Sequence, residues 1–144
     1  SVTDFVRTSG NADGIDKTLV LMEREFEGLC FVNLVDYDML YGHRNDVEGY
    51  AKALTYFDGR LPEILHKMTD EDILMITADH GCDPSTPSTD HSREYTPFVM
   101  YGRNVPAGQN FGTRPTFADI GATALAYFGI EPQIDGHNLL EAYK

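Results

Sequence analysis

The chain has 144 residues, of which 42% are hydrophobic and 24% are charged, a balance that suits one globular domain with an ordinary core. Eleven basic and 23 acidic residues give a formal net charge of -12. This charge argues against nucleic acid or anionic lipid as a partner, because proteins bind both by neutralising phosphates. No apolar run reaches the roughly 18 residues of a membrane span, so we also expect no membrane partner.

The first elements in chain order are a predicted helix and a predicted strand. Apolar residues recur at helical spacing from Ile15 to Phe26, and Gly28 is a suitable stop. Residues 29–35 then form a nearly continuous apolar run, which is typical of a strand buried on both faces.

A second helix is the clearest element of the sequence. Its apolar stripe runs from Val47 to Met68 at helical spacing. Asn45 and Glu48 stand three residues apart just before the stripe and resemble a capping box. We expect the stripe to face the core.

The second half of the chain predicts two more strands and a third helix. The strands are expected at residues 73–77 and 97–101. Thr116 is the expected cap of a helix over residues 117–128, and Gly129 is its expected C-terminal glycine. Strands that alternate with helices indicate an α/β fold with a mainly parallel sheet flanked by helices.

Only two cysteines are present, and neither has an obvious partner. Cys30 lies in an apolar run and Cys82 in a polar loop. We therefore expect two reduced thiols in a cytoplasmic protein, with a disulfide between them as the less favoured alternative.

Carboxylates and histidines gather directly after the predicted strands. Asp38 and His43 follow the first strand, Asp79 and His80 follow the second, and His91 lies in the Ser/Thr/Pro-rich loop before the third. In open α/β sheets the ligand crevice lies outside the carboxyl ends of the strands, so these side chains should share one site. Mixed carboxylate and imidazole ligands suit divalent ions such as Mn, Fe, Co or Zn. Two such ions about 3.5–4 Å apart can clamp a transferring phosphoryl group.

Each of these residues also has a structural interpretation on its own. An isolated Asp38 or His43 is most often a loop hydrogen-bonder, and a lone His91 on a polar loop is most often a surface histidine. Asp79 and His80 could cap the next element. Their occurrence together, in this order and after successive predicted strands, favours a metal site over three unrelated structural roles.

These segments resemble the phosphopentomutases of the alkaline-phosphatase superfamily. Residues 77–81, Thr-Ala-Asp-His-Gly, are similar to the central metal motif of that superfamily, which the cofactor-independent phosphoglycerate mutases share. Residues 38–44 and 90–97 narrow the resemblance to phosphopentomutases. The phosphoglycerate mutases have one residue fewer between the first Asp and His, and they lack the His-x-Arg-Glu-Tyr continuation. The resemblance extends over nearly the whole chain.

The resemblance implies a fold, a site and a reaction. It implies an alkaline-phosphatase-like core in which Asp38, His43 and His91 bind one metal ion while Asp79 and His80 bind another. The reaction would move phosphate between the 1- and 5-positions of ribose or 2-deoxyribose through a phosphothreonine. The family uses manganese, although the ligand set alone would favour Zn over Mn.

The same resemblance implies that parts of the site lie outside these residues. The nucleophilic Thr, an Asp near the N-terminus and the inserted cap domain of the family have no counterpart here. We therefore expect residues 1–144 to be the C-terminal portion of the metal-binding core, with no catalytic nucleophile of their own. Their partners would be a sugar phosphate and the N-terminal part of the same enzyme.

Other functions stay open at this point. Asp36 and Asp38 are spaced like the nucleophile motif of haloacid-dehalogenase-type phosphatases, but Leu40 stands where that motif needs Thr or Val, so Asp36 is expected to be a capping or ligand-supporting carboxylate. A metal-dependent phosphatase or phosphodiesterase of the same superfamily is one alternative, and a non-enzymatic metal-binding domain is another. His66 is expected at the surface and His137 in a structural role.

Overall fold

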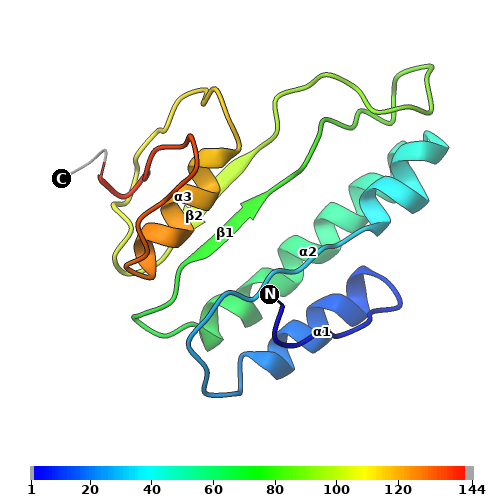
Figure 1. Ribbon diagram of the computed structural model, residues 1–144. Helices are drawn as coiled ribbons and strands as arrows, with labels where there is room; N and C mark the ends of the chain where they lie inside the picture. Colours follow the sequence, from blue (N-terminus) through cyan, green and yellow to red (C-terminus); the bar gives the residue numbers. More distant parts are fainter. Residues whose placement is uncertain (1, 142–144) are drawn as a thin grey trace. The chain divides into compact units, whose positions relative to one another are not determined.

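The computed structural model describes residues 2–141. The described residues form two compact units, one of residues 2–69 and 75–99 and the other of residues 70–74 and 100–141. The elements in chain order are α1 (Asn11–Leu21), a π-helical turn η1 (Tyr37–Tyr41), a 3-10 turn η2 (Gly42–Arg44), α2 (Val47–Lys67), β1 (Leu74–Thr77), β2 (Phe98–Tyr101) and α3 (Ala118–Tyr127) (Figure 1).

Helix α1 begins and ends earlier than the sequence predicts. Its apolar spacing is correct at Ile15 and Leu19, which are both buried. The helix begins at Asn11 because Gly10, with a φ of 153°, turns the chain into it. It ends at Leu21 in two tight turns, and Phe26, the predicted last apolar position, is largely exposed.

The predicted strand at residues 29–35 is wrong for the part of the chain that the structure describes. The segment is extended but joins no sheet there. Most of its apolar side chains face outward, with Leu29 70% exposed and Phe31 83% exposed, whereas Leu34 is half-buried. A strand forms only where a neighbour accepts and donates its backbone hydrogen bonds, and no described segment provides that neighbour.

Helix α2 matches its predicted range to within one residue, but its cap is a different residue. Asp46 is the N-cap, and its carboxylate accepts a hydrogen bond of 2.9 Å from the Gly49 N–H. Glu48 instead pairs with Lys52 one turn later. The predicted capping box of Asn45 and Glu48 is therefore wrong, because the chain turns at Asn45 before the helix begins.

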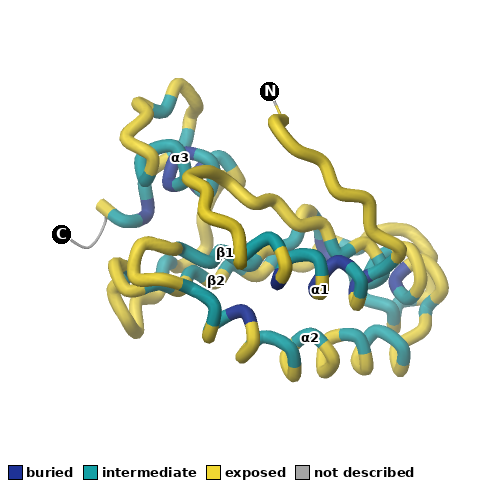
Figure 2. Tube along the Cα trace, turned by 90° about the horizontal axis from the view of Figure 1, so that it is seen from below, coloured by how far each residue is buried: buried dark blue, intermediate teal, exposed yellow. Residues whose placement is uncertain are grey.

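Helices α1 and α2 lie side by side within the first unit (Figure 1). Arg60 of α2 pairs with Asp16 of α1 at 2.8 Å, and Lys67 at the end of α2 pairs with Glu23, just beyond α1, at 2.6 Å. The apolar stripe of α2 is only partly buried, and Figure 2 shows exposed residues recurring along this helix. Ile64 is buried whereas Leu54 is 50% exposed, so the expectation that the whole stripe is core is only partly met.

The two strands pair with each other in antiparallel order. The Thr77 hydroxyl at the end of β1 donates to the Pro97 carbonyl just before β2, whereas Gly102 after β2 lies against the backbone of Asp72 before β1. A parallel pair needs a crossover, usually a helix, but residues 78–97 form none and simply return beside β1. The expected mainly parallel sheet is therefore not met by the described residues, although both strand positions are confirmed.

Helix α3 confirms its prediction closely. The Thr116 hydroxyl accepts a hydrogen bond from the Ala118 N–H at its start. Gly129 follows its end with a φ of 69°, and the Ile130 N–H returns to the Leu125 carbonyl, as in a Schellman motif.

A buried carboxylate organises the second unit. Asp119 is 1% exposed and accepts hydrogen bonds from the Arg114 guanidinium at 2.6 Å and from the His137 backbone N–H at 2.8 Å. Burial acts to raise the pKa of the Asp119 carboxyl, but these hydrogen bonds outweigh it and hold the pKa below its usual value. His137 thus has the structural role expected of it, but through its backbone N–H, which hydrogen-bonds the C-terminal segment to Asp119 of α3.

Two further observations concern the environment of the chain. Among the described residues, every helix is too short or too polar to cross a bilayer. Cys30 and Cys82 are both free thiols.

Candidate metal centre

Two consecutive helical turns place Asp38 and His43. Asp38 lies in η1, a wide turn that opens with a hydrogen bond from the Met39 N–H to the Val35 carbonyl. His43 follows in η2. The Tyr37 hydroxyl donates to the Ala53 carbonyl and so anchors η1 to α2. Asp38 therefore projects from a helical turn after residues 29–35, and not from a strand end as the sequence predicts.

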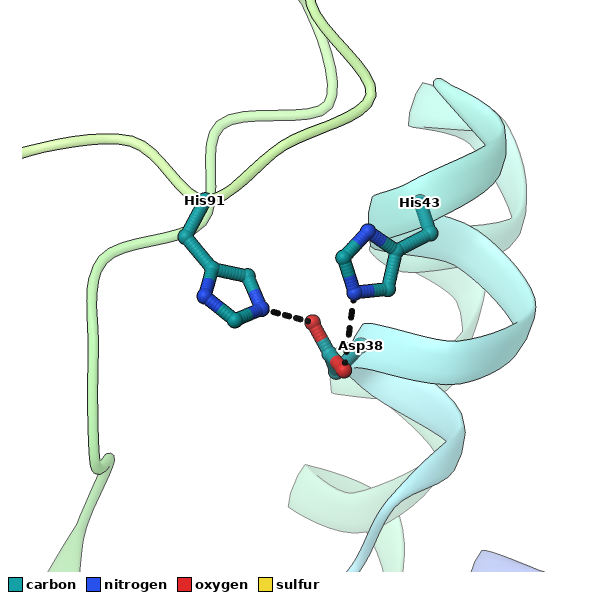
Figure 3. A group of neighbouring side chains, drawn as sticks. All are labelled: Asp38, His43 and His91. Atoms are coloured by element: carbon teal, nitrogen blue, oxygen red, sulfur yellow. Dashed lines mark ion pairs between the residues drawn. The ribbon is translucent and has the colours of Figure 1, made fainter.

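Asp38, His43 and His91 converge in the first unit. Their nearest nitrogen and oxygen atoms all lie within 4.8 Å of one another. The Asp38 carboxylate stands between the two rings, with Oδ2 at 3.3 Å from His43 Nε2 and Oδ1 at 3.4 Å from His91 Nε2 (Figure 3). One carboxylate and two imidazoles facing a common point form a suitable ligand set for a divalent first-row ion.

Backbone carbonyls determine which ring nitrogens can bind a cation. His43 Nδ1 lies 2.5 Å from the Thr89 carbonyl oxygen, and His80 Nδ1 lies 3.0 Å from the Gly81 carbonyl oxygen. A carbonyl only accepts, so Nδ1 is the donor in both rings and Nε2 is the atom left to bind a cation. Nε2 of His43 faces the Asp38 carboxylate, and Nε2 of His80 lies between Asp79 and Asp38. Metal-binding histidines commonly donate from their other nitrogen in this way.

The atoms around Asp38 fit a cation. Asp38 Oδ1 is buried and accepts no hydrogen bond from the described residues. Nε2 of His43 and Nε2 of His91 face the two Asp38 oxygens at 3.3 and 3.4 Å. A buried anionic oxygen without a donor is costly, and a cation between these atoms would supply the contact that Asp38 Oδ1 lacks.

His80 joins the cluster from its side, whereas Asp79 does not. His80 Nε2 lies 3.9 Å from Asp38 Oδ1, and its ring stacks on His91 with centroids 3.7 Å apart and an interplanar angle of 17°. Asp79 touches only the edge of the cluster, with Oδ1 at 3.6 Å from His80 Nε2 and a side chain that is 89% exposed. Three of the five predicted ligands, His43, His80 and His91, therefore surround a fourth, Asp38, whereas Asp79 faces outward.

Close backbone approaches hold the segments that carry these side chains. Gly81 forms an antiparallel bridge with Ser92 and so closes the loop that carries His91. A Cβ atom on Gly42 would lie 2.5 Å from Cys82 Sγ, so glycine at this position lets η2 approach the segment after His80. The two glycines bring the turn and the loop together.

Burial and nearby carboxylates shift the titration of a thiol and two tyrosines around the site. Burial and then the charges of Asp38, Glu94 and Asp83 raise the pKa of the Cys82 thiol. Burial, Cys82 and Asp38 likewise raise the pKa of Tyr50, and burial with Tyr50 and Asp36 raises the pKa of Tyr37 to about 12. Burial, the largest cause of each shift, disfavours any charge, whereas the smaller contribution of Asp38 at Cys82 and Tyr50 is specific to negative charge.

Asp36 has a partner outside this cluster. Its carboxylate accepts a hydrogen bond of 2.7 Å from the Asn11 N–H, and its own N–H donates to Asn11 Oδ1 at 3.0 Å. The carboxylate thereby satisfies a backbone donor in the first turn of α1, in line with the capping role expected from the sequence. His66 is exposed near the end of α2, as expected.

Two groups that support the site had no recognised signal in the sequence. One is the Thr89 carbonyl, which orients His43. The other is Asn45, whose side-chain amide reaches the loop before His91. The position of Asn45 in a turn could have indicated its contact with the loop, but its spacing from Glu48 favoured a helix cap instead.

Comparisons with known proteins identify the family. The family model described as the metalloenzyme superfamily matches residues 1–132. A protein of Lachnoclostridium phytofermentans named phosphopentomutase is 64% identical over 97% of this chain and 36% of its own length. Proteins of the same name from Desulfitobacterium hafniense and Acetivibrio thermocellus are 58% and 55% identical, each over 96% of this chain. The chain spans about a third of the length of these relatives. It belongs to the metalloenzyme superfamily.

Proposed function

We propose that residues 1–144 are the C-terminal part of the catalytic core of a phosphopentomutase. The longer enzyme interconverts ribose or deoxyribose 1-phosphate and the corresponding 5-phosphate. The observation that carries the proposal is the convergence of Asp38, His43 and His91 in a chain that is 55–64% identical to proteins named phosphopentomutase. The N-terminal core segment and the cap domain would come from the remaining length of such relatives.

The proposed metal ligands are the five residues named from the sequence. Asp38, His43 and His91 would hold one divalent ion, and Asp79 and His80 would contribute to a second, with Mn²⁺ as the expected metal in both. The ions would offset charge on the transferring phosphoryl group and lower the pKa of the attacking hydroxyl. The exposed Asp79 needs further ligands from outside this chain to complete its site.

The protein's own residues keep these side chains in place. The Thr89 carbonyl holds the Nδ1 proton of His43, which leaves Nε2 available as a ligand atom. The Gly81 carbonyl does the same for His80, and stacking on His91 limits rotation of both rings. Such orientation supports phosphoryl transfer because that reaction depends on positioning and electrostatics more than on covalent chemistry by the protein.

The fold proposed for the longer enzyme also explains the exposed apolar run. Residues 29–35 would form a strand of a mainly parallel sheet once neighbouring strands from the rest of the enzyme pair with them. Leu29 and Phe31 are 70% and 83% exposed here, and burying such side chains stabilises a fold by about 1.5–3 kcal/mol each. Two free cysteines support a cytoplasmic enzyme.

The test is an assay of the full-length enzyme. With Mn²⁺ added, we expect it to convert ribose 1-phosphate to ribose 5-phosphate, and His43→Ala or His91→Ala should reduce the rate by orders of magnitude without unfolding the protein. His66→Ala, a substitution of an exposed histidine on α2, is the matched control and should retain full activity. Release of inorganic phosphate in place of the isomer would indicate a phosphatase and refute the proposal.

A further inference from the structure

Asn45 has an unusual backbone conformation beside the metal centre. Its φ of 53° and ψ of 31° are left-handed, and among the described residues it is the one non-glycine residue with a positive φ. Asn tolerates this conformation better than most residues do. The conformation ends η2 immediately after His43 and Arg44, and the Asn45 side chain reaches residues 84–88.

The Asn45 amide contacts three carbonyl groups of a single loop. Nδ2 lies 2.5 Å from the Thr86 oxygen, 3.0 Å from the Ser88 oxygen and 3.4 Å from the Pro84 oxygen. The two hydrogens of the –NH2 can serve the nearer Thr86 and Ser88 oxygens, with the Pro84 oxygen at longer range, whereas an aliphatic side chain or a carboxylate offers no hydrogen there. The contact joins positions about forty residues apart in the sequence.

The same loop carries two groups of the metal centre. At its base, the Ser92 N–H donates to the Gly81 carbonyl at 3.3 Å and the Ser92 hydroxyl accepts from the Asp83 N–H at 2.7 Å. On its far side, the Thr89 carbonyl meets His43 Nδ1, and His91 follows two residues later. Between the base and the far side of the loop lie residues 84–88. Among the described residues, the side-chain hydrogen bonds from η2 and its cap to this stretch come from the Asn45 amide.

We propose that Asn45 is a positioning residue for the metal centre. By gathering the carbonyls of residues 84–88, its amide holds the loop so that the Thr89 carbonyl meets His43 and the His91 ring faces Asp38. Asn45 acts through these groups and does not itself touch the ion. The inference rests on the proposed metal site, and it adds a residue to which no ligand role is assigned.

Two substitutions in the full-length enzyme separate the amide from the backbone. Asn45→Gly permits the left-handed conformation but removes the amide, and Asn45→Asp keeps the size but turns a donor into an acceptor. We expect both to weaken Mn²⁺ binding by about 10–100-fold in isothermal titration, the usual effect of losing a group that orients a ligand. Asn104→Asp is the matched control and should bind Mn²⁺ as tightly as the natural protein, since Asn104 contacts Asp70 and not this loop.

A second readout does not depend on metal or catalysis. In the metal-free enzyme, amide hydrogen exchange in residues 83–92 should accelerate in both variants, while exchange in α2 stays unchanged. Far-UV circular dichroism establishes that each variant is folded, and Asn45→Gly carries the test if Asn45→Asp does not fold. Natural affinity and natural loop exchange in Asn45→Gly would show that only the backbone conformation matters, and would overturn the inference.

The two proposals fail in different ways. If the natural enzyme lacks pentomutase activity but both variants still lose Mn²⁺ affinity and loop protection, the proposed function is wrong and the role of Asn45 stands. If the natural enzyme is an active pentomutase and Asn45→Gly matches it in both measurements, the role of Asn45 is wrong and the function stands.

Discussion

Replacing Gly81 by alanine tests how tightly the loop that carries His91 is held. A Cβ atom at this position would lie 2.7 Å from both the Ser92 carbonyl oxygen and the Glu94 N–H nitrogen. Both neighbours are backbone atoms, so neither can rotate away as a side chain would. The segment 92–94 must retreat by about 0.7 Å to bring the 2.7 Å contacts to 3.4 Å, the lower bound of ordinary contact.

The cost follows from that displacement. Overpacking of this kind costs about 1–3 kcal/mol in the free energy of unfolding. The same shift moves His91 relative to Asp38, and metal sites tolerate only about 0.2 Å in ligand distance. We therefore expect Gly81→Ala to lower Mn²⁺ affinity by at least about tenfold in the full-length enzyme, measured by isothermal titration, together with reduced stability in urea.

The control for this substitution is Gly59→Ala. Gly59 lies inside α2, and an added Cβ would meet nothing within 4 Å. Alanine should stabilise the helix there by about 0.5–1 kcal/mol and leave metal affinity unchanged. If Gly81→Ala also kept natural affinity and stability, the bridge between Gly81 and Ser92 would not be what positions His91.

Three further predictions concern the isolated chain and its second unit. The 144-residue chain alone should show no mutase turnover even with Mn²⁺, because we expect the nucleophilic Thr to lie outside it; turnover by a preparation free of the full-length enzyme would contradict this. Elemental analysis of the same chain should find at most one tightly held ion, bound by Asp38, His43 and His91, and two such ions would contradict the ligand assignment. In the full-length enzyme, Asp119→Asn should lower the free energy of unfolding by about 1–3 kcal/mol at pH 7, because a buried N–H and Arg114 lose an anionic acceptor. Since the pKa of Asp119 is depressed, its contribution is complete above about pH 4 and is lost as the pH falls through the folded-state pKa, so urea titrations should show the difference shrinking at pH 3.

Local signals in the sequence predicted the ranges of α2 and α3 well, the bounds of α1 less well and the strand pairing poorly. The stripe of α2 and the Thr116 and Gly129 signals of α3 act within a few residues, so the sequence shows them directly. Residues 29–35 are apolar like a buried strand, but a strand depends on neighbours that a local pattern cannot supply.

The sequence predicted which residues form the candidate site, but not which elements bring them together. The spacing and order of Asp38, His43 and His91 indicated a metal site, and these side chains do lie together. The expected reason, parallel strand ends meeting at one edge, does not apply to the described residues. Helical turns and a loop closed at Gly81 gather them instead, through backbone contacts that no residue pattern encodes.

The central claim is that the named carboxylate and histidines bind divalent metal. Anomalous diffraction at the manganese absorption edge, from crystals of the full-length enzyme grown with Mn²⁺, tests it most directly. We predict one peak bound by Asp38, His43 and His91 and a second peak beside Asp79 and His80. Peaks at other residues, with none between Asp38 and the two histidines, would contradict the account.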